Sequence, residues 1–238
     1  MDRKEGHVKM EITAEMILEG RRIRIWGDPA SPICFIQMTD DHDEEDMGEE
    51  TGQICAGAGE KGWCLITVSV KNWNDDLTPW KADPVFGKEG FGAGAGETLS
   101  YLTDVLLPWV DRTYPAEDRT YFLGGYSLAG LFALWCGYQT DLFRGVAGVS
   151  PSVWYPGWRD YMKCHAMQAE RVYLSLGDKE EKTRNRTMAQ VGDAIRDQYQ
   201  VLTGAGIKCT LEWNPGGHFR DSGKRTGKGL VWLIRSGE

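Results

Sequence analysis

One serine of the chain stands where a strand-like run passes into a helix-like run. Tyr121–Leu123 is short, apolar and rich in β-forming residues, and two glycines follow it; after Ser127 the chain continues as small and apolar residues with helical character. This order is typical of a nucleophile elbow, a tight turn that lifts a serine hydroxyl above the end of a strand. Gly125 and Ala129 keep the turn uncrowded, and alanine in place of the commoner glycine is a mild departure because it adds one methyl group.

A serine hydroxyl is a useful nucleophile only when a base takes its proton, and a carboxylate usually orients that base. The chain has four histidines. His7 lies in the N-terminal stretch, His42 lies in an acidic segment before the serine, and His165 lies in a predicted short helix. His218 alone follows the last predicted strand, in a Gly-Gly-His-Phe turn. We therefore predict His218 as the base.

The expected chain order of such a triad is serine, acid, histidine, so the acid should follow a strand between Ser127 and His218. The strand that ends at Leu176 continues as Gly-Asp-Lys-Glu-Glu. A loop at this place commonly presents its acid three residues after the glycine, which favours Glu180. Asp178 is the main rival, because aspartate is the more frequent acid and this one is nearer to the strand.

Acyl transfer also needs N–H donors for the negative charge that develops on the carbonyl oxygen. The backbone N–H of Leu128, directly after the serine, is the predicted first donor. The second should come from the loop after the first buried strand, which places it at Thr39 or Asp40. An acidic side chain beside an oxyanion is unfavourable, so Asp40 would have to turn its carboxylate away.

Two other segments resemble known binding sites, one for a metal ion and one for a dinucleotide. The acidic run over residues 39–46 suggests metal binding, but it lacks the glycine and the regular ligand spacing of a calcium loop, so we predict a solvated loop and no metal. Residues 90–96 read Gly-Phe-Gly-Ala-Gly-Ala-Gly, yet no strand leads into them as a dinucleotide-binding motif requires. We predict that they lead into a helix.

These side chains must be positioned by a sheet. Two antiparallel edge strands are predicted from Val8 to Trp26 with a turn at Glu19-Gly20, and a long irregular segment over 71–96 is expected to be functional. Buried strands are predicted over 32–38, 63–70, 119–123, 143–149, 171–176 and 208–213. Helices are predicted over 97–113 with a kink or a fresh turn at Pro108, after Ser127, over 159–168, over 188–202 and around 230–234. The alternation predicts an α/β fold with a mostly parallel sheet and helices on both faces, in one domain over 1–238.

The composition and net charge of the chain exclude some classes of binding partner. Hydrophobic residues make up 41% of the 238 positions and the formal net charge is −8, which argues against nucleic acid or an anionic membrane as a partner. The six cysteines are scattered without metal-binding or disulfide spacing. The N-terminus shows no apolar leader, and no run is long enough to span a membrane, so the expected location is the cytoplasm. The oligomeric state does not follow from the sequence.

Taken together, four motifs resemble those of the α/β-hydrolase putative esterases, a group that includes esterase D and the enterochelin esterases. They are the Gly-Tyr-Ser-Leu-Ala-Gly elbow, Ser150–Tyr155, Gly177–Glu180 and Gly217-His218, and the resemblance covers residues 32 to 238. It implies an α/β-hydrolase fold, no cofactor, and hydrolysis through an acyl-enzyme with Ser127 as nucleophile, Glu180 as acid and His218 as base. Met38-Thr39-Asp40 departs from the family's His-Gly or Asp-Gly pair, which weakens the assignment of the second oxyanion donor.

The predicted function is therefore hydrolysis of a small-molecule carboxylic ester by a serine esterase. A serine peptidase or acyltransferase of the same fold is the first alternative, and a non-catalytic binding protein is the second. Five aromatic residues are candidates for the walls of the substrate pocket, with about half expected to be core instead: Trp73, Trp80, Phe91, Trp154 and Tyr155. The acidic charge favours an uncharged or weakly cationic ester.

Overall fold

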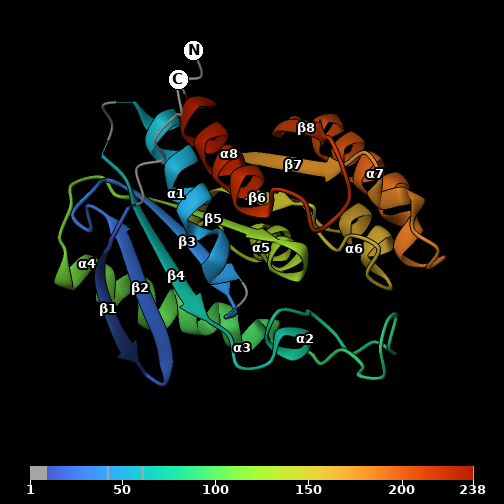
Figure 1. Cartoon of the computed structure of the whole chain (residues 1–238), viewed down its shortest axis with the longest axis horizontal. Helices are drawn as coiled ribbons and strands as arrows, with labels where there is room; N and C mark the ends of the chain where they lie inside the picture. The colour runs from blue at the N-terminus through green and yellow to red at the C-terminus, as the bar shows by residue number, and fades with distance from the viewer. Residues whose placement is uncertain (1–9, 42, 60–61, 238) are drawn as a thin grey trace, which may run out of the picture.

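A single eight-stranded sheet runs through the computed structural model, which describes residues 10–41, 43–59 and 62–237 (Figure 1). The strand order is β1-β2-β4-β3-β5-β6-β7-β8. The strands are β1 (Ile12–Leu18), β2 (Arg21–Gly27), β3 (Ile33–Thr39), β4 (Cys64–Ser69), β5 (Thr120–Tyr126), β6 (Phe143–Val149), β7 (Arg171–Gly177) and β8 (Lys208–Asn214).

Pairing is antiparallel only at the N-terminal end of the sheet. β1 pairs with β2 and β2 pairs with β4 in antiparallel fashion, whereas every pair from β4 through β3 to β8 is parallel. The carboxyl ends of β3 to β8 therefore meet at one edge of the sheet, where parallel sheets place their functional loops. The fold is the predicted α/β-hydrolase arrangement.

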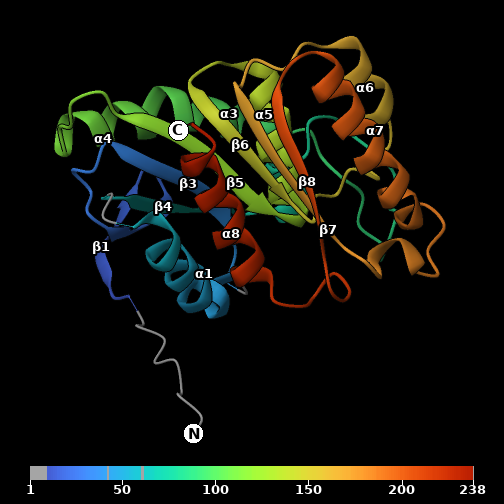
Figure 2. The ribbon, with the colours of Figure 1, turned by 90° about the horizontal axis from the view of Figure 1, so that it is seen from above.

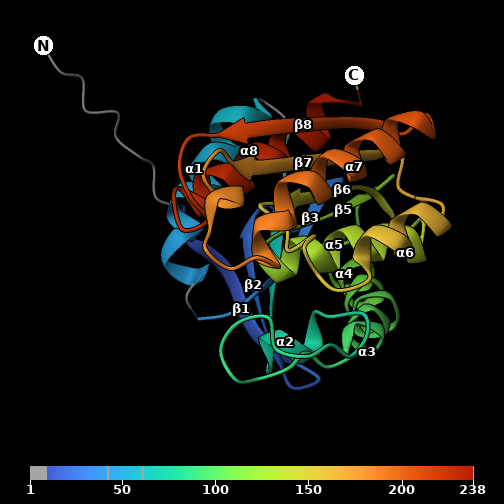
Figure 3. The ribbon, with the colours of Figure 1, turned by 90° about the vertical axis from the view of Figure 1, so that its right-hand side faces the viewer.

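Helices cover both faces of the sheet (Figure 2). One face carries α1 (Asp43–Ala58) and α8 (Ser222–Arg235), which pack against each other. The other face carries the continuous helical run α3 (Ala95–Ser100), η1 (Tyr101–Leu106) and α4 (Leu107–Thr113), followed by α5 (Ser127–Gln139), α6 (Trp158–Cys164) and α7 (Val191–Gly204). Figure 3 shows β8 at the far edge of the sheet with α7 beside it, and the short helix α2 (Trp73–Asp76) next to α3.

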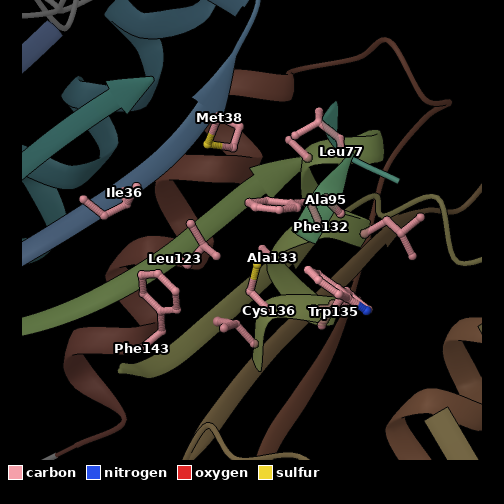
Figure 4. Packing of buried hydrophobic residues seen from close by; sticks show 14 of the residues in the cluster. Ile36, Met38, Leu77, Ala95, Leu123, Phe132, Ala133, Trp135, Cys136 and Phe143 are labelled. Atoms are coloured by element: carbon pink, nitrogen blue, oxygen red, sulfur yellow. The ribbon is translucent and has the colours of Figure 1, made fainter. Parts of the chain in front are cut away.

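The helix that follows Ser127 is buried along most of its length. Residues Leu128–Tyr138 of α5 are all buried, and Figure 4 shows Phe132 and Cys136 packed toward side chains of β3, β5 and β6. A helix that is apolar all round belongs in a core. Burial of α5 against three strands fixes the place of its first residue, Ser127, above the sheet.

The acidic run after β3 is a loop at Asp40 and Asp41, but from Asp43 it is the first turn of a helix, so the prediction of a solvated loop is wrong for residues 43–46. Asp43 opens α1, and Asp40 and Asp43 exchange backbone-to-side-chain hydrogen bonds across the helix start at 3.0 and 3.1 Å. Carboxylates in the first turn of a helix interact favourably with its dipole. The sequence did not predict α1 because its glycines lower helix propensity.

The other elements follow the prediction closely, apart from α2, which lies inside the segment predicted as irregular, the end of α6 at Cys164 instead of residue 168, and two further differences. The helical run over 97–113 has no gap at Pro108, but Pro108 lies in the first turn of a new segment, α4, as the fresh-turn alternative predicts. The π-helical segment before it ends where the Leu107 N–H bonds to the Leu102 carbonyl five residues back. The C-terminal helix begins at Ser222, two turns before the predicted start. His7, His42 and Val8 lie outside the described residues.

No helix in the described part of the chain combines the length and the apolar character that a membrane span requires.

Candidate active site

The elbow has the geometry that its sequence predicts. Ser127 ends the turn between β5 and α5 with φ of +57°, in the left-handed region that a non-glycine residue enters at a cost of about 1–3 kcal/mol. A Cβ on Gly125 would lie 2.6 Å from the backbone carbonyl of Ala129, so only glycine fits there. The Ala129 methyl is buried and accommodated because Gly125 has no side chain. The missing second glycine of the motif therefore does not distort the turn.

Ser127, His218 and Glu180 come together at the carboxyl ends of β5, β8 and β7. Ser127 Oγ lies 3.1 Å from His218 Nε2, and His218 Nδ1 lies 2.7 Å from Glu180 Oε2. In the tautomer that fits both contacts, Nδ1–H donates to the carboxylate and Nε2 accepts from the serine hydroxyl. The His218 side chain is 25% exposed and the Glu180 side chain 5%, so the histidine reaches solvent and the acid does not.

The buried carboxylate of Glu180 stays ionised because its hydrogen bonds outweigh its burial. Burial alone raises its pKa, but the hydrogen bond and charge of His218, with donors from the Ser150 hydroxyl and the Gly177 N–H, bring the pKa below the usual value of 4.5. Both of these donors lie 2.7 Å from Oε1. The carboxylate can therefore hold the imidazole and balance the charge of an imidazolium.

Asp178, the rival acid, points elsewhere. It is exposed, and its Oδ1 accepts a 2.8 Å hydrogen bond from the backbone N–H of Gly216. This contact supports the loop before His218 without reaching the imidazole. Of the two candidate acids, only Glu180 lies beside the histidine.

The segment predicted to hold oxyanion donors borders the same site. Leu128 lies in the first turn of α5, where backbone N–H groups have no carbonyl partner within the helix. Thr39 ends β3, while the Asp40 N–H donates to Asp43 Oδ2. The Asp40 carboxylate accepts from the Asp43 N–H, so it is held at the helix start. An oxyanion would have to displace Asp43 to use the Asp40 N–H.

Two cavities meet at His218 and Phe219. The first, which we call the Ser127 cleft, has a volume of about 490 Å³ and is lined by Asp40, Asp43, Asp46, Trp73, Tyr126, Ser127, His218, Phe219 and Ser222. The second, the Trp154 pocket, has a volume of about 230 Å³ and is lined by Ser150, Pro151, Trp154, Lys179, Glu180, Thr183, Met188, Val191, Gly217, His218 and Phe219. A larger hollow of about 660 Å³ between β1, β2 and α1 has no nucleophile in its lining, so size does not identify the functional cavity.

The five aromatic candidates divide between the cavities and the core. Trp73 lines the Ser127 cleft and Trp154 lines the Trp154 pocket. Trp80, Phe91 and Tyr155 are in the lining of neither cavity. The Trp80 Nε1–H donates to the Pro156 carbonyl and the Tyr155 hydroxyl donates to the Trp80 carbonyl, at 2.7 and 2.5 Å, while Phe91 is 5% exposed and packs edge-on against Tyr155. These contacts attach the 71–96 segment to the loop after β6.

Several residues at the site were not predicted. Ser150 donates to Glu180, and the hydroxyl of Ser152 lies 3.4 Å from that of Ser127. Phe219 is 96% exposed at the junction of the two cavities. Arg225 contacts Glu180 from α8. The Ser-Pro-Ser sequence after β6 and the phenylalanine after His218 were visible signals, whereas nothing in the local sequence marks Arg225.

His165 lies apart from the Ser127 site, and the described residues hold no metal-binding cluster. Tyr161 lies in α6 and His165 directly follows that helix. The His165 ring stacks on the Tyr161 ring, and its Nδ1 lies 2.8 Å from the Tyr161 carbonyl oxygen. Among the described residues, no group of three histidine, cysteine, aspartate or glutamate side chains is arranged to hold a metal ion.

The strand order, the strained serine between strand and helix, and the histidine after β8 define the α/β-hydrolase class. The model of the "Putative esterase" family matches residues 51–218, and the chain belongs to that family. The protein is accordingly a carboxylic ester hydrolase. No curated protein sequence matches the chain.

Solved structures share the fold at low sequence identity. The siderophore hydrolase EstA from Aspergillus nidulans has a TM-score of 0.74 and 17% identity, covering 100% of this chain and 98% of its own. An IroE-like serine hydrolase from Shewanella oneidensis has a TM-score of 0.74 and 15% identity over 93% of this chain and 80% of its own. The enterobactin esterase FES from Shigella flexneri has a TM-score of 0.68 and 16% identity, over 97% of this chain and 60% of its own.

Proposed function

We propose that this esterase hydrolyses a small-molecule ester through an acyl-enzyme on Ser127, with His218 as the general base and Glu180 as the acid that orients it. The observation that carries the proposal is the continuous contact from Ser127 Oγ to His218 Nε2 at 3.1 Å and from His218 Nδ1 to Glu180 Oε2 at 2.7 Å. Nucleophile, base and orienting group in this relation define the chemistry of serine hydrolases.

The first half of the reaction forms the acyl-enzyme. Ser127 Oγ attacks the ester carbonyl carbon while its proton passes to His218 Nε2, and the Glu180 carboxylate stabilises the resulting imidazolium. The negative charge on the carbonyl oxygen is received by the Leu128 N–H at the start of α5, together with a donor from Thr39, or from Asp40 once its N–H has left Asp43. Collapse of the tetrahedral intermediate breaks the bond to the alcohol oxygen, which takes the proton from His218.

The second half repeats these steps with water as the nucleophile. His218 accepts a proton from a water molecule that attacks the acyl carbon, and it returns the proton to Ser127 Oγ as the acid product leaves. Every proton moves through one imidazole, so the reaction needs no further acid or base. The Ser127 cleft is open to solvent beside His218, as water entry requires.

The lining of the two cavities supports a particular kind of substrate. Three aspartates line the Ser127 cleft, which disfavours an anionic ester by Coulomb repulsion. The Trp154 pocket offers Pro151, Trp154, Met188 and Val191 to an apolar group of modest size. We infer that the substrate is an uncharged or cationic ester with one small apolar arm. The Aspergillus protein is described as a siderophore hydrolase and the Shigella protein as an enterobactin esterase, so esters of these two kinds should be assayed as well.

A direct test is hydrolysis of p-nitrophenyl butyrate by the wild type and by Ser127→Ala. The wild type should turn over the ester, and the variant should lose activity by about 10⁴-fold or more. A fluorophosphonate probe should label the wild type and Ser152→Ala but not Ser127→Ala. Ser152 is the matched control because its hydroxyl lies 3.4 Å from that of Ser127.

The alternatives predict different results in the same experiment. A peptidase or acyltransferase of this fold would label at Ser127 but would turn over a peptide, or transfer the acyl group to an added alcohol, faster than it hydrolyses the ester. A non-catalytic binding protein would neither hydrolyse nor label. Full activity in Ser127→Ala would rule the proposal out.

A further inference from the structure

Arg225 is a buried charge directly behind the candidate active site. It lies in the first two turns of α8, and its side chain is only 3% exposed. A charged group is costly to remove from water unless it is paired and hydrogen-bonded, so its contacts indicate what it is for. Neither the Ser127 cleft nor the Trp154 pocket has Arg225 in its lining. It therefore does not reach a substrate held in either cavity.

The guanidinium contacts the acid and the histidine loop at the same time. Nη1 lies 3.5 Å from Glu180 Oε1, and it donates to the Gly217 carbonyl at 3.2 Å. Nη2 donates to the Pro215 carbonyl at 2.9 Å. Glu180 follows β7 and the two carbonyls follow β8, so one planar group joins the ends of two neighbouring strands. The fixed fork of arginine suits this arrangement because its donors diverge at set angles.

The contacts to Glu180 are divided between its two oxygens. Oε1 faces the Ser150 hydroxyl, the Gly177 N–H and Arg225, at 2.7, 2.7 and 3.5 Å. Oε2 faces His218 Nδ1 at 2.7 Å. Donors on one oxygen prevent the carboxylate from rotating about its last bond. The other oxygen is thereby held toward the imidazole.

The backbone of His218 is held from a second direction. The Tyr126 hydroxyl donates to the His218 carbonyl at 2.5 Å, and Arg225 Nη1 donates to that hydroxyl at 3.3 Å. Tyr126 is the last residue of β5 and precedes Ser127. The network around Arg225 therefore links the three strand ends that carry the serine, the acid and the histidine.

We propose that Arg225 is a positioning residue for ester hydrolysis. It holds the Glu180 carboxylate and the His218 loop in the relative positions that the hydrogen bond between Glu180 Oε2 and His218 Nδ1 requires. The inference rests on the proposed roles of Ser127, Glu180 and His218. It follows that loss of the guanidinium misplaces the acid relative to the imidazole, while Trp154, Met188 and Val191 of the Trp154 pocket keep their places because Arg225 bonds to none of them. The chemical step should slow and substrate binding should not change.

The test compares Arg225→Met with Arg225→Lys, using p-nitrophenyl butyrate and active-site titration with a fluorophosphonate to count functional sites. Arg225→Met should lower kcat by about 10- to 100-fold, the range seen when a group that orients a functional side chain is removed, with KM within about threefold of wild type. Arg225→Lys should recover part of kcat, because the ammonium can still pair with Glu180 but cannot bond both loop carbonyls.

Arg171→Met is the matched control. Arg171 is also a buried arginine that bonds a backbone carbonyl, that of Leu233, but it lies at the opposite end of β7. Its loss should lower the thermal midpoint while kcat per titrated site stays within about twofold of wild type. A comparable fall in kcat in this control would mean that a buried arginine acts only through overall folding, and it would overturn the proposal.

A double-mutant cycle asks whether Arg225 acts through the acid. In the Glu180→Gln background, the added Arg225→Met change should cost at most about threefold in kcat, because no carboxylate is left to position. Should Arg225→Met fail to fold, the same cycle is run with Arg225→Lys. The proposal is overturned if the loss is undiminished in the Glu180→Gln background, if a folded Arg225→Met keeps wild-type kcat, or if only KM changes. Activity that survives Ser127→Ala would instead overturn the proposed function itself.

Discussion

The Ser150 hydroxyl donates a 2.7 Å hydrogen bond to Glu180 Oε1, on the carboxylate oxygen that does not face His218. Ser150 is 1% exposed and has φ of +43°, so a serine is held in left-handed backbone geometry directly after β6. Strain of this kind persists where the surrounding structure imposes it. Here the strained residue presents its side chain to the acid of the candidate triad.

Replacing Ser150 by alanine should lower the free energy of unfolding and move the acid unfolding transition of the protein. The Glu180 pKa lies below its ordinary 4.5 in the folded protein, so its contribution to stability is present above that value and is lost as the pH falls through the folded pKa. Ser150→Ala removes one cause of the lowering, and the acid unfolding transition should move to higher pH. The cost near pH 7 should be about 1–3 kcal/mol. Urea unfolding from pH 3 to 7 measures both, and an unchanged acid transition would contradict the prediction.

The identity of the acid can be tested with two amide variants. Glu180→Gln should lower kcat by about 1,000-fold or more, because the amide can impose the wrong imidazole tautomer and carries no charge to balance an imidazolium. Asp178→Asn should cost less than about tenfold, because Asp178 only accepts a hydrogen bond from the Gly216 N–H. Steady-state rates on one ester measure both. A larger loss in Asp178→Asn would reverse the assignment.

Phe219 should determine preference among substrates without contributing to the fold. Its ring is 96% exposed and lies at the junction of the two cavities, edge-on to His218. Phe219→Ala should leave the thermal midpoint unchanged and lower kcat/KM for butyrate or phenylacetate esters by about 3- to 10-fold relative to acetate. The measurement is a series of p-nitrophenyl esters of increasing acyl size. An equal effect on every ester would show that the ring does not contact the substrate.

The charge of the substrate should affect kcat/KM because three aspartates line the Ser127 cleft. An ester that carries a carboxylate, such as a monosuccinate, should be hydrolysed with a kcat/KM about tenfold lower than its neutral counterpart, since like charges about 4 Å apart repel by about 1–4 kcal/mol near a protein surface. Asp46→Asn should narrow this gap, and so should high salt. Equal rates for both esters at low salt would be evidence against an acidic substrate cleft.

Glu50 should make the protein less stable as the pH rises. Glu50 is 2% exposed, and burial, followed by the nearby Asp43 and Asp46, raises its pKa from 4.5 to about 8 despite the hydrogen bond from Gln37. The folded state thus holds a proton that the unfolded state releases, and stability falls between pH 4.5 and about 8.

Glu50→Gln removes this titration. The variant should gain about 3 kcal/mol relative to wild type at pH 7 and much less at pH 5. Chemical unfolding at the two pH values measures the difference. A gain of the same size at both would show that Glu50 does not titrate in this range.

Local sequence patterns were sufficient to predict the sheet and the strand that each candidate residue follows. The near-continuous apolar runs predicted the parallel strands, and the small residues around Ser127 predicted a tight turn, because both depend on burial and on space within a few residues. The order of serine, acid and histidine along a parallel sheet then placed Ser127, Glu180 and His218 at one edge, where the structure brings them within hydrogen-bond distance.

Helices α1 and α8 were predicted poorly because their stability is tertiary. Both contain glycines that lower helix propensity, but a Cβ on Gly227 would lie 2.5 Å from the Glu50 carbonyl, so glycine permits the close approach of the two helices. Propensity describes an isolated segment, whereas these helices are stabilised by packing against each other and on the sheet. The misassigned acidic run and the late predicted start of α8 have this common cause.

The sequence by itself determined the fold class, the candidate nucleophile and base, and the loop after β7 that supplies the acid, since these follow from periodicity, turn chemistry and chain order. Only the tertiary structure decided which carboxylate faces His218, which aromatic rings line a cavity, and that Arg225 and Ser150 hold Glu180. Those relations join residues on different strands and helices. Their distances depend on how the elements pack, and no short stretch of sequence contains that information.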